Sequence, residues 1–304
     1  MQRVGEVDDI ARAYVSCVRK PFAIGLVTTV DGDSVLPSTG HKVRSMARVL
    51  VTGSTDGLGL MAARLLVEDG HAVTLHARNA TRAADAQRAL PQAEAIVVGD
   101  LSSIAETRHL AEQINDLGRY HAVIHNAGVG NREPRRLETL DGLCHVFAIN
   151  VLAAYLLTAL LTRPDRLVYL SSGLHRRGNA RLDDPQWTHR PWNGAQAYSD
   201  SKLYDVLLAF AVARRWPSVR SNALEPGWVP TKMGGPDAPD DLVLGAATQT
   251  WLAVSNDPAA TVTGRYFYHQ QPQQPHPSTL SSSPQDALLT YCAELTGTEL
   301  PPMT

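Results

Sequence analysis

From residue 46 onward, short apolar runs alternate with longer segments whose apolar residues recur every three or four positions. The first run, 48–52, is apolar almost throughout and ends at Gly53, which predicts a buried strand. Gly70 marks the end of the helix that follows. The apolar stripe of this helix is formed by Leu58, Met61, Ala62, Leu65 and Leu66.

The same alternation continues to the end of the chain. Further strands are predicted at 71–77, 95–98, 121–125, 166–170, 219–224 and 265–268. Helices are predicted at 83–90, 104–117, 137–161 and 196–216, with a short last helix after a surface loop at 270–284. Apolar strands that are each joined to the next by a helix form a parallel sheet covered on both faces. With right-handed crossovers, this predicts an α/β fold: a doubly wound Rossmann sheet of about seven strands in a single domain, 46–304.

Residues 1–45 lack this alternation and mix both signs of charge, for example at Asp9, Arg12 and Arg19. A secretory signal would have a cleaner basic-then-apolar order and a small-residue cleavage site. We therefore expect a disordered N-terminal extension. Met46 directly precedes the first convincing strand. This suggests that translation starts at Met46, which the intact mass of the natively expressed protein would test.

Composition narrows the class of protein. The chain is 44% hydrophobic and 19% charged with a net charge of −2, as in soluble globular proteins, and this balance gives no reason to bind nucleic acid or an anionic membrane. Its longest apolar stretches, such as 151–161, are far shorter than the roughly 20 residues of a membrane span. Cys17, Cys144 and Cys292 are too few and too scattered for a disulfide framework, so we expect a cytoplasmic protein. The spacing of the histidines and cysteines predicts no metal site.

The segment between the first strand and the first helix is rich in glycine and reads Thr52-Gly-Ser-Thr-Asp-Gly-Leu-Gly59. Gly53, Gly57 and Gly59 permit a tight turn and let the backbone approach a ligand closely. The helix N-terminus offers free N–H groups and a dipole that favour anions. Glycines in this position predict a site for the pyrophosphate of a dinucleotide cofactor.

Three further groups of polar residues suggest redox chemistry. Tyr198 and Lys202 lie four residues apart in a helical segment and so share one face. A nearby ammonium lowers the pKa of a tyrosine from its usual value of about 10, so Tyr198 could exchange a proton with an alcohol or carbonyl while a hydride moves to or from a nicotinamide. Ser171 and Ser172 end the fifth strand at the sheet edge where α/β proteins place their sites, and a serine there can bind the substrate oxygen. Asn150 interrupts an otherwise apolar helix, and a buried polar residue needs a reason.

In their order and spacing these motifs resemble the short-chain dehydrogenase/reductase family, whose turn reads Thr-Gly-x3-Gly-x-Gly, and within it the retinol-dehydrogenase-like members. The resemblance covers about 46–264. It implies that Lys202 also holds the nicotinamide ribose, that Ser172 rather than Ser171 binds the substrate oxygen, and that Asn150 holds a water linked to the lysine. Besides the turn glycines, Tyr198 and Lys202, the residues that it assigns to the cofactor are Ser54, Thr55, Leu58, Asp100, Leu101, Asn126, Ala127, Gly128, Pro226, Gly227, Val229 and Thr231.

The end of the second strand bears on the choice between NADP and NAD. An NAD site usually has an acid there for the ribose 2′-OH, but this strand ends Leu75-His-Ala-Arg-Asn79. Arg78, with Arg82 as a helper, could pair with a 2′-phosphate, and in related reductases an arginine at this place goes with NADP. Asp56 argues slightly the other way, because many NADP-dependent members have a basic residue at its position. The sequence therefore favours NADP over NAD.

Other functions remain open. A protein of this fold could bind NADP as a sensor or interaction partner without turnover, although a sensor has no need of the Tyr198–Lys202 pair. A sugar-nucleotide epimerase shares Tyr-x3-Lys but has a different glycine spacing. His175 lies near Ser172, yet the elbow motif of a serine hydrolase is missing.

The substrate is predicted only as a small, fairly hydrophobic alcohol, ketone or aldehyde. Ser172 and Tyr198 are 26 residues apart, so 176–195 resembles an inserted loop over the site. The tryptophans in loops near the proposed cleft, which could line an apolar pocket or be partly buried for packing, are Trp187, Trp192 and Trp228. The helices 137–161 and 196–216 could form a homodimer, with contributions from Val206, Leu207 and Phe210, or those residues could pack internally.

Overall fold

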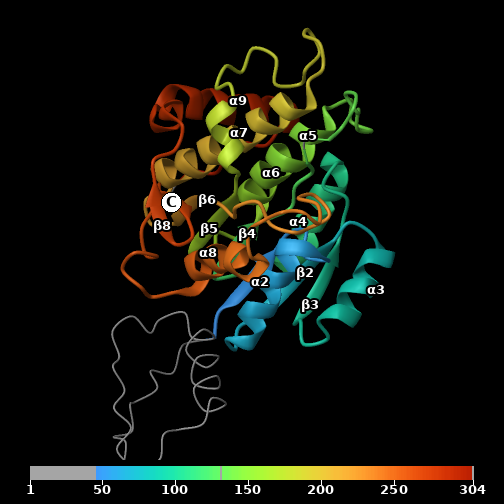
Figure 1. Cartoon of the computed structure of the whole chain (residues 1–304), viewed down its shortest axis with the longest axis vertical. Coiled ribbons are helices and arrows are strands. Elements are labelled where there is room, and N and C mark those ends of the chain that lie inside the picture. The colour runs from blue at the N-terminus through green and yellow to red at the C-terminus, as the bar shows by residue number, and fades with distance from the viewer. Residues whose placement is uncertain (1–45, 131, 303–304) are drawn as a thin grey trace, which may run out of the picture. The chain divides into compact units, whose positions relative to one another are not determined.

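The computed structural model describes residues 46–130 and 132–302. Their strands form one sheet in the order β3-β2-β1-β4-β5-β6-β7-β8 (Figure 1), in which all neighbours are parallel except the antiparallel pair β7 and β8. The strands are β1 (Arg48–Val51), β2 (Ala72–Ala77), β3 (Ala95–Val98), β4 (Ala122–His125), β5 (Arg166–Leu170), β6 (Arg220–Glu225), β7 (Tyr266–Tyr268) and β8 (Gln271–Gln273). The predicted doubly wound α/β fold is confirmed, with eight strands in place of about seven. The predictions for residues 1–45 lie outside the described residues.

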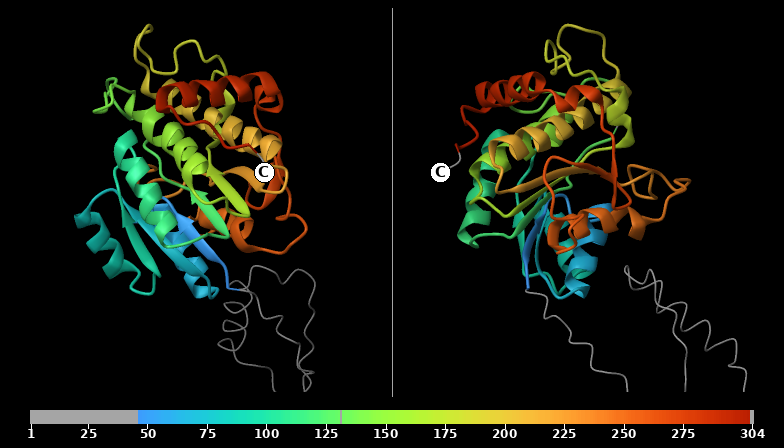
Figure 2. Two further views of the ribbon diagram at one scale, coloured as in Figure 1. Left: turned by 180° about the vertical axis from the view of Figure 1, so that it is seen from behind. Right: turned by 90° about the vertical axis from the view of Figure 1, so that its left-hand side faces the viewer.

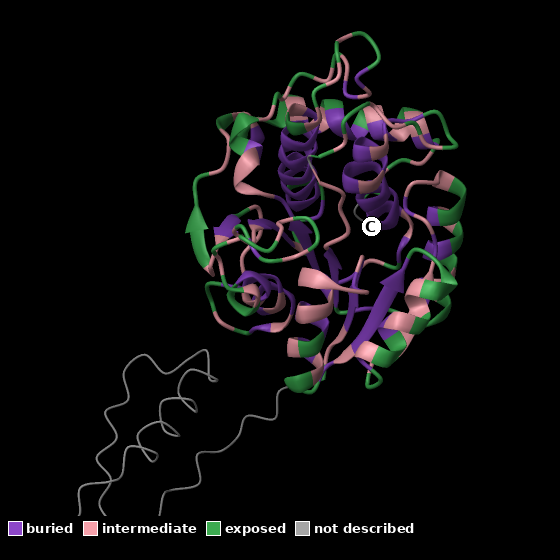
Figure 3. Ribbon diagram, turned by 45° about the vertical axis from the view of Figure 1, so that its right-hand side comes forward, coloured by how far each residue is buried: buried purple, intermediate pink, exposed green. Residues whose placement is uncertain are grey.

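Helices cover both faces of the sheet, because alternate side chains of each buried strand point to opposite sides. On one face, Val49 and Val51 of β1 pack with the helices α2 (Gly57–Glu68), α3 (Ala80–Ala89) and α8 (Leu242–Val254). On the other face, Leu50 packs with a second group of helices. These are α4 (Ile104–Asp116), α6 (Ala153–Leu160) and α7 (Gly194–Arg215). The strands at the centre of the sheet and α7 are accordingly buried, as the purple ribbons of Figure 3 show, whereas the edge strand β8 is exposed.

The last helix, α9 (Ser282–Thr296), covers α7 and also contacts α6. Figure 2 shows it in red, lying along α7 in both views. The segment after α9 continues this cover, since the Trp216 indole donates to the Pro301 carbonyl at 2.8 Å. Residues that sequence reasoning left open as dimer contacts, such as Leu207 and Phe210, are therefore buried within a single chain.

Three local predictions differ from the structure. The helix predicted at 137–161 begins only at His145, as α5 (His145–Phe147), the π-helical turn η1 (Ala148–Leu152) and α6. Before it the chain turns at Gly142, whose φ of +75° suits glycine, so the apolar spacing that suggested a longer helix belongs to a loop. The helix α8 was not predicted, and part of the predicted loop at 270–284 forms β8 and the 3₁₀ turn η3 (Pro277–Leu280).

Two other features, a membrane-spanning helix and a cluster of metal ligands, were sought in the described residues. Across 46–130 and 132–302, no helix is long and apolar enough to cross a membrane. Over the same residues, no group of three or more His, Cys, Asp or Glu side chains could hold a metal ion.

Candidate active site

A cleft of about 1000 Å³ opens where the turns after β1 to β6 meet, at the carboxyl edge of the parallel strands. This is where doubly wound sheets place their ligands. The predicted site residues that line it are Gly53, Thr55, Gly57, Leu58, Gly59, Arg78, Asp100, Leu101, Asn126, Ala127, Gly128, Ser172, Tyr198, Lys202, Pro226, Gly227, Val229 and Thr231. The two remaining predicted residues, Ser54 and Asn150, are buried behind the wall of the cleft.

The glycine-rich turn is packed so closely that side chains would not fit. Gly53 has a φ of +61°, and a Cβ there would lie 2.8 Å from the Cα of Ala127. A Cβ on Gly59 would lie 2.5 Å from the Asn126 amide nitrogen. That amide crosses from the turn after β4 and donates to the carbonyls of Thr52 (2.9 Å) and Gly53 (3.1 Å). Gly53, Gly57 and Gly59 also line the cleft, beside the N-terminus of α2.

A buried histidine that sequence reasoning missed braces this turn. Nδ1 of His76 accepts a hydrogen bond from the Gly53 N–H at 3.0 Å, so Nε2 carries the proton and donates to the Gly99 carbonyl at 2.9 Å. Burial lowers the pKa of His76, which keeps the ring neutral and suits this pattern. Ser54 completes the brace, because its hydroxyl donates to the Val51 carbonyl and accepts from the His76 N–H. Ser54 thus supports the turn from behind instead of facing the cleft.

Basic side chains gather at the end of the cleft beside β2. Arg78 lines the cleft and is exposed. Arg82 donates to the Thr55 hydroxyl at 2.8 Å and to the Asp56 carboxylate at 2.5 Å, and Lys232 reaches the same carboxylate at 2.6 Å. Partial burial acts to raise the pKa of Asp56, but Lys232 and Arg82 hold it below its usual value. Asp56 therefore pairs with two cations, Arg82 and Lys232. Nothing in the sequence had pointed to Lys232 as part of this group.

Tyr198 and Lys202 lie on one face of α7 and both reach the cleft, as their spacing predicts. The helix begins after Asn193, whose side chain accepts from the Gln196 N–H. The Lys202 ammonium lies 5.9 Å from the centre of the Tyr198 ring and donates to the Leu170 carbonyl at 2.7 Å. It also pairs at 2.8 Å with a carboxylate not considered from the sequence, that of Asp205.

The two serines after β5 have different surroundings. The Ser171 hydroxyl is buried and donates to the backbone carbonyl of Lys202 at 2.7 Å, so it ties β5 to α7. The Ser172 side chain caps the short turn η2 (Gly173–Arg177) by accepting from the Leu174 N–H, and its hydroxyl proton remains available to a ligand. Of the two hydroxyls, that of Ser172 is the better placed to donate into the cleft.

Asn150 lies in the π-helical turn η1, a local distortion that is common at functional sites. Its side-chain oxygen accepts from the Val129 N–H at 2.8 Å, and its amide donates to the Ser201 hydroxyl at 2.9 Å. It lies near Lys202, since a Cβ on Gly128 would lie 3.4 Å from Asn150 Oδ1 and 3.5 Å from the Lys202 ammonium. Asn150 thus joins the turn after β4 to α7, directly behind Lys202.

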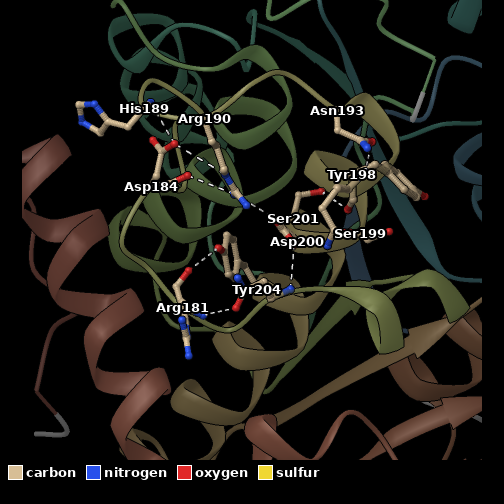
Figure 4. A network of polar contacts seen from close by, with 12 residues as sticks. Arg181, Asp184, His189, Arg190, Asn193, Tyr198, Ser199, Asp200, Ser201 and Tyr204 are labelled. Carbon is tan, nitrogen blue, oxygen red and sulfur yellow. Dashed lines mark hydrogen bonds and ion pairs between the residues drawn. The ribbon is translucent and has the colours of Figure 1, made fainter.

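The long loop after η2 does not lie over the cleft as the sequence suggested. Figure 4 shows it against the first turns of α7, where Arg190 pairs with Asp184 and, at 3.0 Å, with Asp200. Trp187 is buried beneath Arg190, and in the described part of the chain no residue of 176–195 lines the cleft. Trp228 does line it and is 56% exposed.

Comparison with known proteins finds a matching family model and several relatives. The family model described as short chain dehydrogenase matches residues 47–241. An uncharacterized oxidoreductase of Emericella nidulans is 44% identical over 260 residues, covering 84% of this chain and 99% of that protein. Human retinol dehydrogenase 13 is 31% identical over 290 residues, covering 83% of this chain and 85% of that protein. A crystal structure of an uncharacterized protein from Mycobacterium Paratuberculosis matches with a TM-score of 0.72 at 27% identity, covering 84% and 95% of the two chains.

The fold, the glycine-rich turn and these relatives agree with the resemblance found in the sequence. The chain belongs to the short-chain dehydrogenase family of oxidoreductases and has retinol dehydrogenases among its relatives.

Proposed function

We propose that this protein is an NADP-dependent oxidoreductase that transfers a hydride between the cofactor and a hydrophobic alcohol or carbonyl compound. The observation that carries the proposal is the convergence of Tyr198, Lys202 and Ser172 on the cleft that the glycine-rich turn also faces. Side chains from α7 and from the end of β5 meet there although they are far apart in the sequence. A binding protein without turnover has no need of a proton donor at this place.

The cleft suits a dinucleotide. Gly53, Gly57 and Gly59 line the cleft with bare backbone, next to the positive end of α2. Arg78 supplies a cation for a 2′-phosphate at the end of β2, and this favours NADP over NAD. Arg82 could assist once it releases Asp56. Lys202 could hold the nicotinamide ribose, as the resemblance to the family implies.

The catalytic residues act on the substrate oxygen. When bound, a reduced nicotinamide supplies the hydride. In the reducing direction Tyr198 gives its hydroxyl proton to the carbonyl oxygen, and the nearby ammonium of Lys202 stabilises the phenolate that remains. Ser172 donates a hydrogen bond to the same oxygen and holds it in place. Asn150 keeps the Val129 segment and α7 in register behind the lysine.

Part of the cleft lining is apolar. It includes Ile149, Leu174, Val229 and Met233, and the Met233 sulfur lies 3.9 Å from the Tyr198 hydroxyl. A pocket of this kind gains affinity from burying apolar surface and orients its ligand through few polar groups. A hydrophobic substrate with one reactive oxygen fits this description.

Purified protein tests the proposal when it is titrated with NADPH and with NADH and then given a panel of aldehydes, ketones and quinones. We expect tighter binding of NADPH, and consumption of NADPH by wild type that Tyr198→Phe abolishes while it retains cofactor binding. Tyr204→Phe is the matched control, because it removes another hydroxyl from α7 that donates to the Arg181 carbonyl away from the cleft. A folded protein that binds neither nucleotide would refute the proposal, and equal turnover by Tyr198→Phe would refute the role of the tyrosine.

A further inference from the structure

A buried acid lies next to the proposed catalytic lysine. Asp205 is three residues after Lys202 on α7, and the two side chains are only 4% and 5% exposed. The carboxylate oxygen lies 2.8 Å from the ammonium nitrogen. Removing both charges from water is costly, and a well-packed apolar pair is often as stable as a buried ion pair. Stability alone is thus a weak reason for an acid at this position.

The surroundings of Asp205 keep the pair isolated and ionised. Besides Lys202 on its own helix, Tyr169 on β5 interacts electrostatically with Asp205, and the Tyr169 hydroxyl is hydrogen-bonded to Thr158 at 2.8 Å. His125 of β4 stacks on Tyr169, and burial keeps its ring neutral. Burial raises the pKa of Asp205 to about 6 although Lys202 acts to lower it. Burial also acts to lower the pKa of Lys202, but Asp205 and Tyr198 raise it, so both partners are charged near neutral pH.

The geometry fixes the direction in which the ammonium acts. Lys202 donates one hydrogen bond to Asp205 and one to the Leu170 carbonyl, which leaves its third N–H for the cleft. The Tyr198 ring lies beside this ammonium, with its centre 5.9 Å from the nitrogen. The negative charge of Asp205 partly cancels the positive charge that Lys202 presents to the Tyr198 hydroxyl.

We propose that Asp205 is a positioning residue, which clamps the Lys202 ammonium against the Leu170 carbonyl and sets how strongly that ammonium acts on Tyr198. The inference rests on the proposed function, because it assigns to Asp205 the control of the proposed proton donor. Asp205 reaches the chemistry only through the lysine, since it is buried behind the wall of the cleft.

Asp205→Asn separates the charge of this residue from its shape. The amide keeps an oxygen that can accept from Lys202 but carries no negative charge, so the full charge of the ammonium acts on Tyr198. We expect the Tyr198 hydroxyl to ionise at a lower pH than in wild type, by on the order of one pH unit, as expected for the loss of one nearby charge in a partly screened interior. Asp205→Glu retains the negative charge, and in this variant we expect the Tyr198 hydroxyl to ionise at the same pH as in wild type.

Ultraviolet difference titration of the cofactor-free protein measures this directly, with the spectrum of the same variant carrying Tyr198→Phe subtracted to isolate the one phenol. The pH profile of kcat/KM is the second readout, and its limb assigned to Tyr198 should move by the same amount. Asp200→Asn is the matched control, because Asp200 is also a buried acid of α7 but pairs with Arg190 at 3.0 Å. We expect it to leave both the titration and the pH profile unchanged.

Each outcome is decisive. An Asp205→Asn titration that coincides with wild type overturns the inference, as does an equal shift in Asp200→Asn. If Asp205→Asn fails to fold, Asp205→Thr is close to aspartate in size, keeps a hydroxyl oxygen that can accept from Lys202, carries no charge, and has the same expected shift. A wild type without cofactor-dependent turnover refutes the proposed function, but the cofactor-free titration still tests the link from Asp205 to Tyr198.

Discussion

Replacing Gly59 with alanine places a methyl group where the glycine-rich turn, α2 and the turn after β4 meet. The new Cβ would lie 2.5 Å from the Asn126 amide nitrogen, 2.5 Å from the Gly53 carbonyl oxygen and 2.9 Å from the Ser54 Cα. Carbon atoms prefer separations of about 3.5–4.0 Å. Two of the three atoms belong to the backbone, so turning one side chain cannot relieve the overlap. We expect the turn to shift and the Asn126 side chain to leave its place.

The size of the effect follows from the hydrogen bonds that break and from the overlap itself. Asn126 would give up its hydrogen bonds to the Thr52 and Gly53 carbonyls, each worth about 1 kcal/mol of net stability. Overpacking adds about 1–3 kcal/mol. Alanine returns about 1 kcal/mol, because it is the better helix former. We expect the free energy of unfolding to fall by about 2–4 kcal/mol, and NADPH to bind at least tenfold more weakly because the displaced turn lines the proposed cofactor site.

Urea unfolding measures the stability change, and calorimetric titration measures the binding of NADPH. Gly70→Ala is the matched control at the other end of α2, where φ is +84° but nothing lies within 4 Å of the added Cβ. Backbone strain should cost this variant about 1–2 kcal/mol and leave cofactor binding intact. A Gly59→Ala protein as stable as wild type, with unchanged affinity for NADPH, would refute the close packing described for the turn.

Three further outcomes are expected. Arg78→Ala should weaken NADPH binding about tenfold or more and leave NADH binding unchanged, whereas Arg88→Ala, on the exposed side of α3, should change the binding of neither cofactor. Calorimetric titration measures both affinities, and an equal loss for NADPH and NADH in Arg78→Ala would contradict the prediction. The free energy of unfolding should fall as the pH falls from about 6.5 toward about 3, because burial lowers the pKa of His125 to about 3 and the histidine is therefore protonated first in the unfolded chain. His125→Gln should flatten this part of the curve of stability against pH, and an unchanged slope would show that His125 does not cause the decline. Light scattering should give the mass of one chain, because α9 and the bond from Trp216 to Pro301 cover α6 and α7, and a dimeric mass would show that another face associates.

The sequence predicted most of the sheet because most of the parallel strands are short, largely apolar runs that end in a turn. The helices with one polar face, such as α4, were also predicted closely. The helix α8 was missed because it packs against α2 and the sheet, so even Thr248 and Gln249 are buried and no polar face marks it. At 137–144 the apolar spacing was misleading, since Leu140 is fully exposed in a turn closed by Gly142.

The candidate site, like the fold, could be predicted from the sequence only in part. Motifs that act locally, such as the glycine-rich turn and the spacing of Tyr198 and Lys202, could be read from the sequence because strand ends and helix turns place them. Asp205 could not, because an acid three residues after a lysine also fits an exposed helical ion pair. The pair is buried because it lies on the side of α7 that faces β5, where Lys202 donates to the Leu170 carbonyl. Lys232 reaches Asp56 through a long loop whose path has no local signature.

The central claim is that the cleft transfers a hydride with Tyr198 as its proton donor. Transfer of label tests this most directly: the protein is incubated with NADPH deuterated at the reactive C4 position and a carbonyl compound that it consumes, and the alcohol is analysed by mass spectrometry. We expect wild type and Tyr204→Phe to place deuterium on the carbonyl carbon, and Tyr198→Phe to form no labelled alcohol while still binding NADPH. Labelled alcohol formed equally well by Tyr198→Phe, or NADPH consumption without label in the product, would contradict the account.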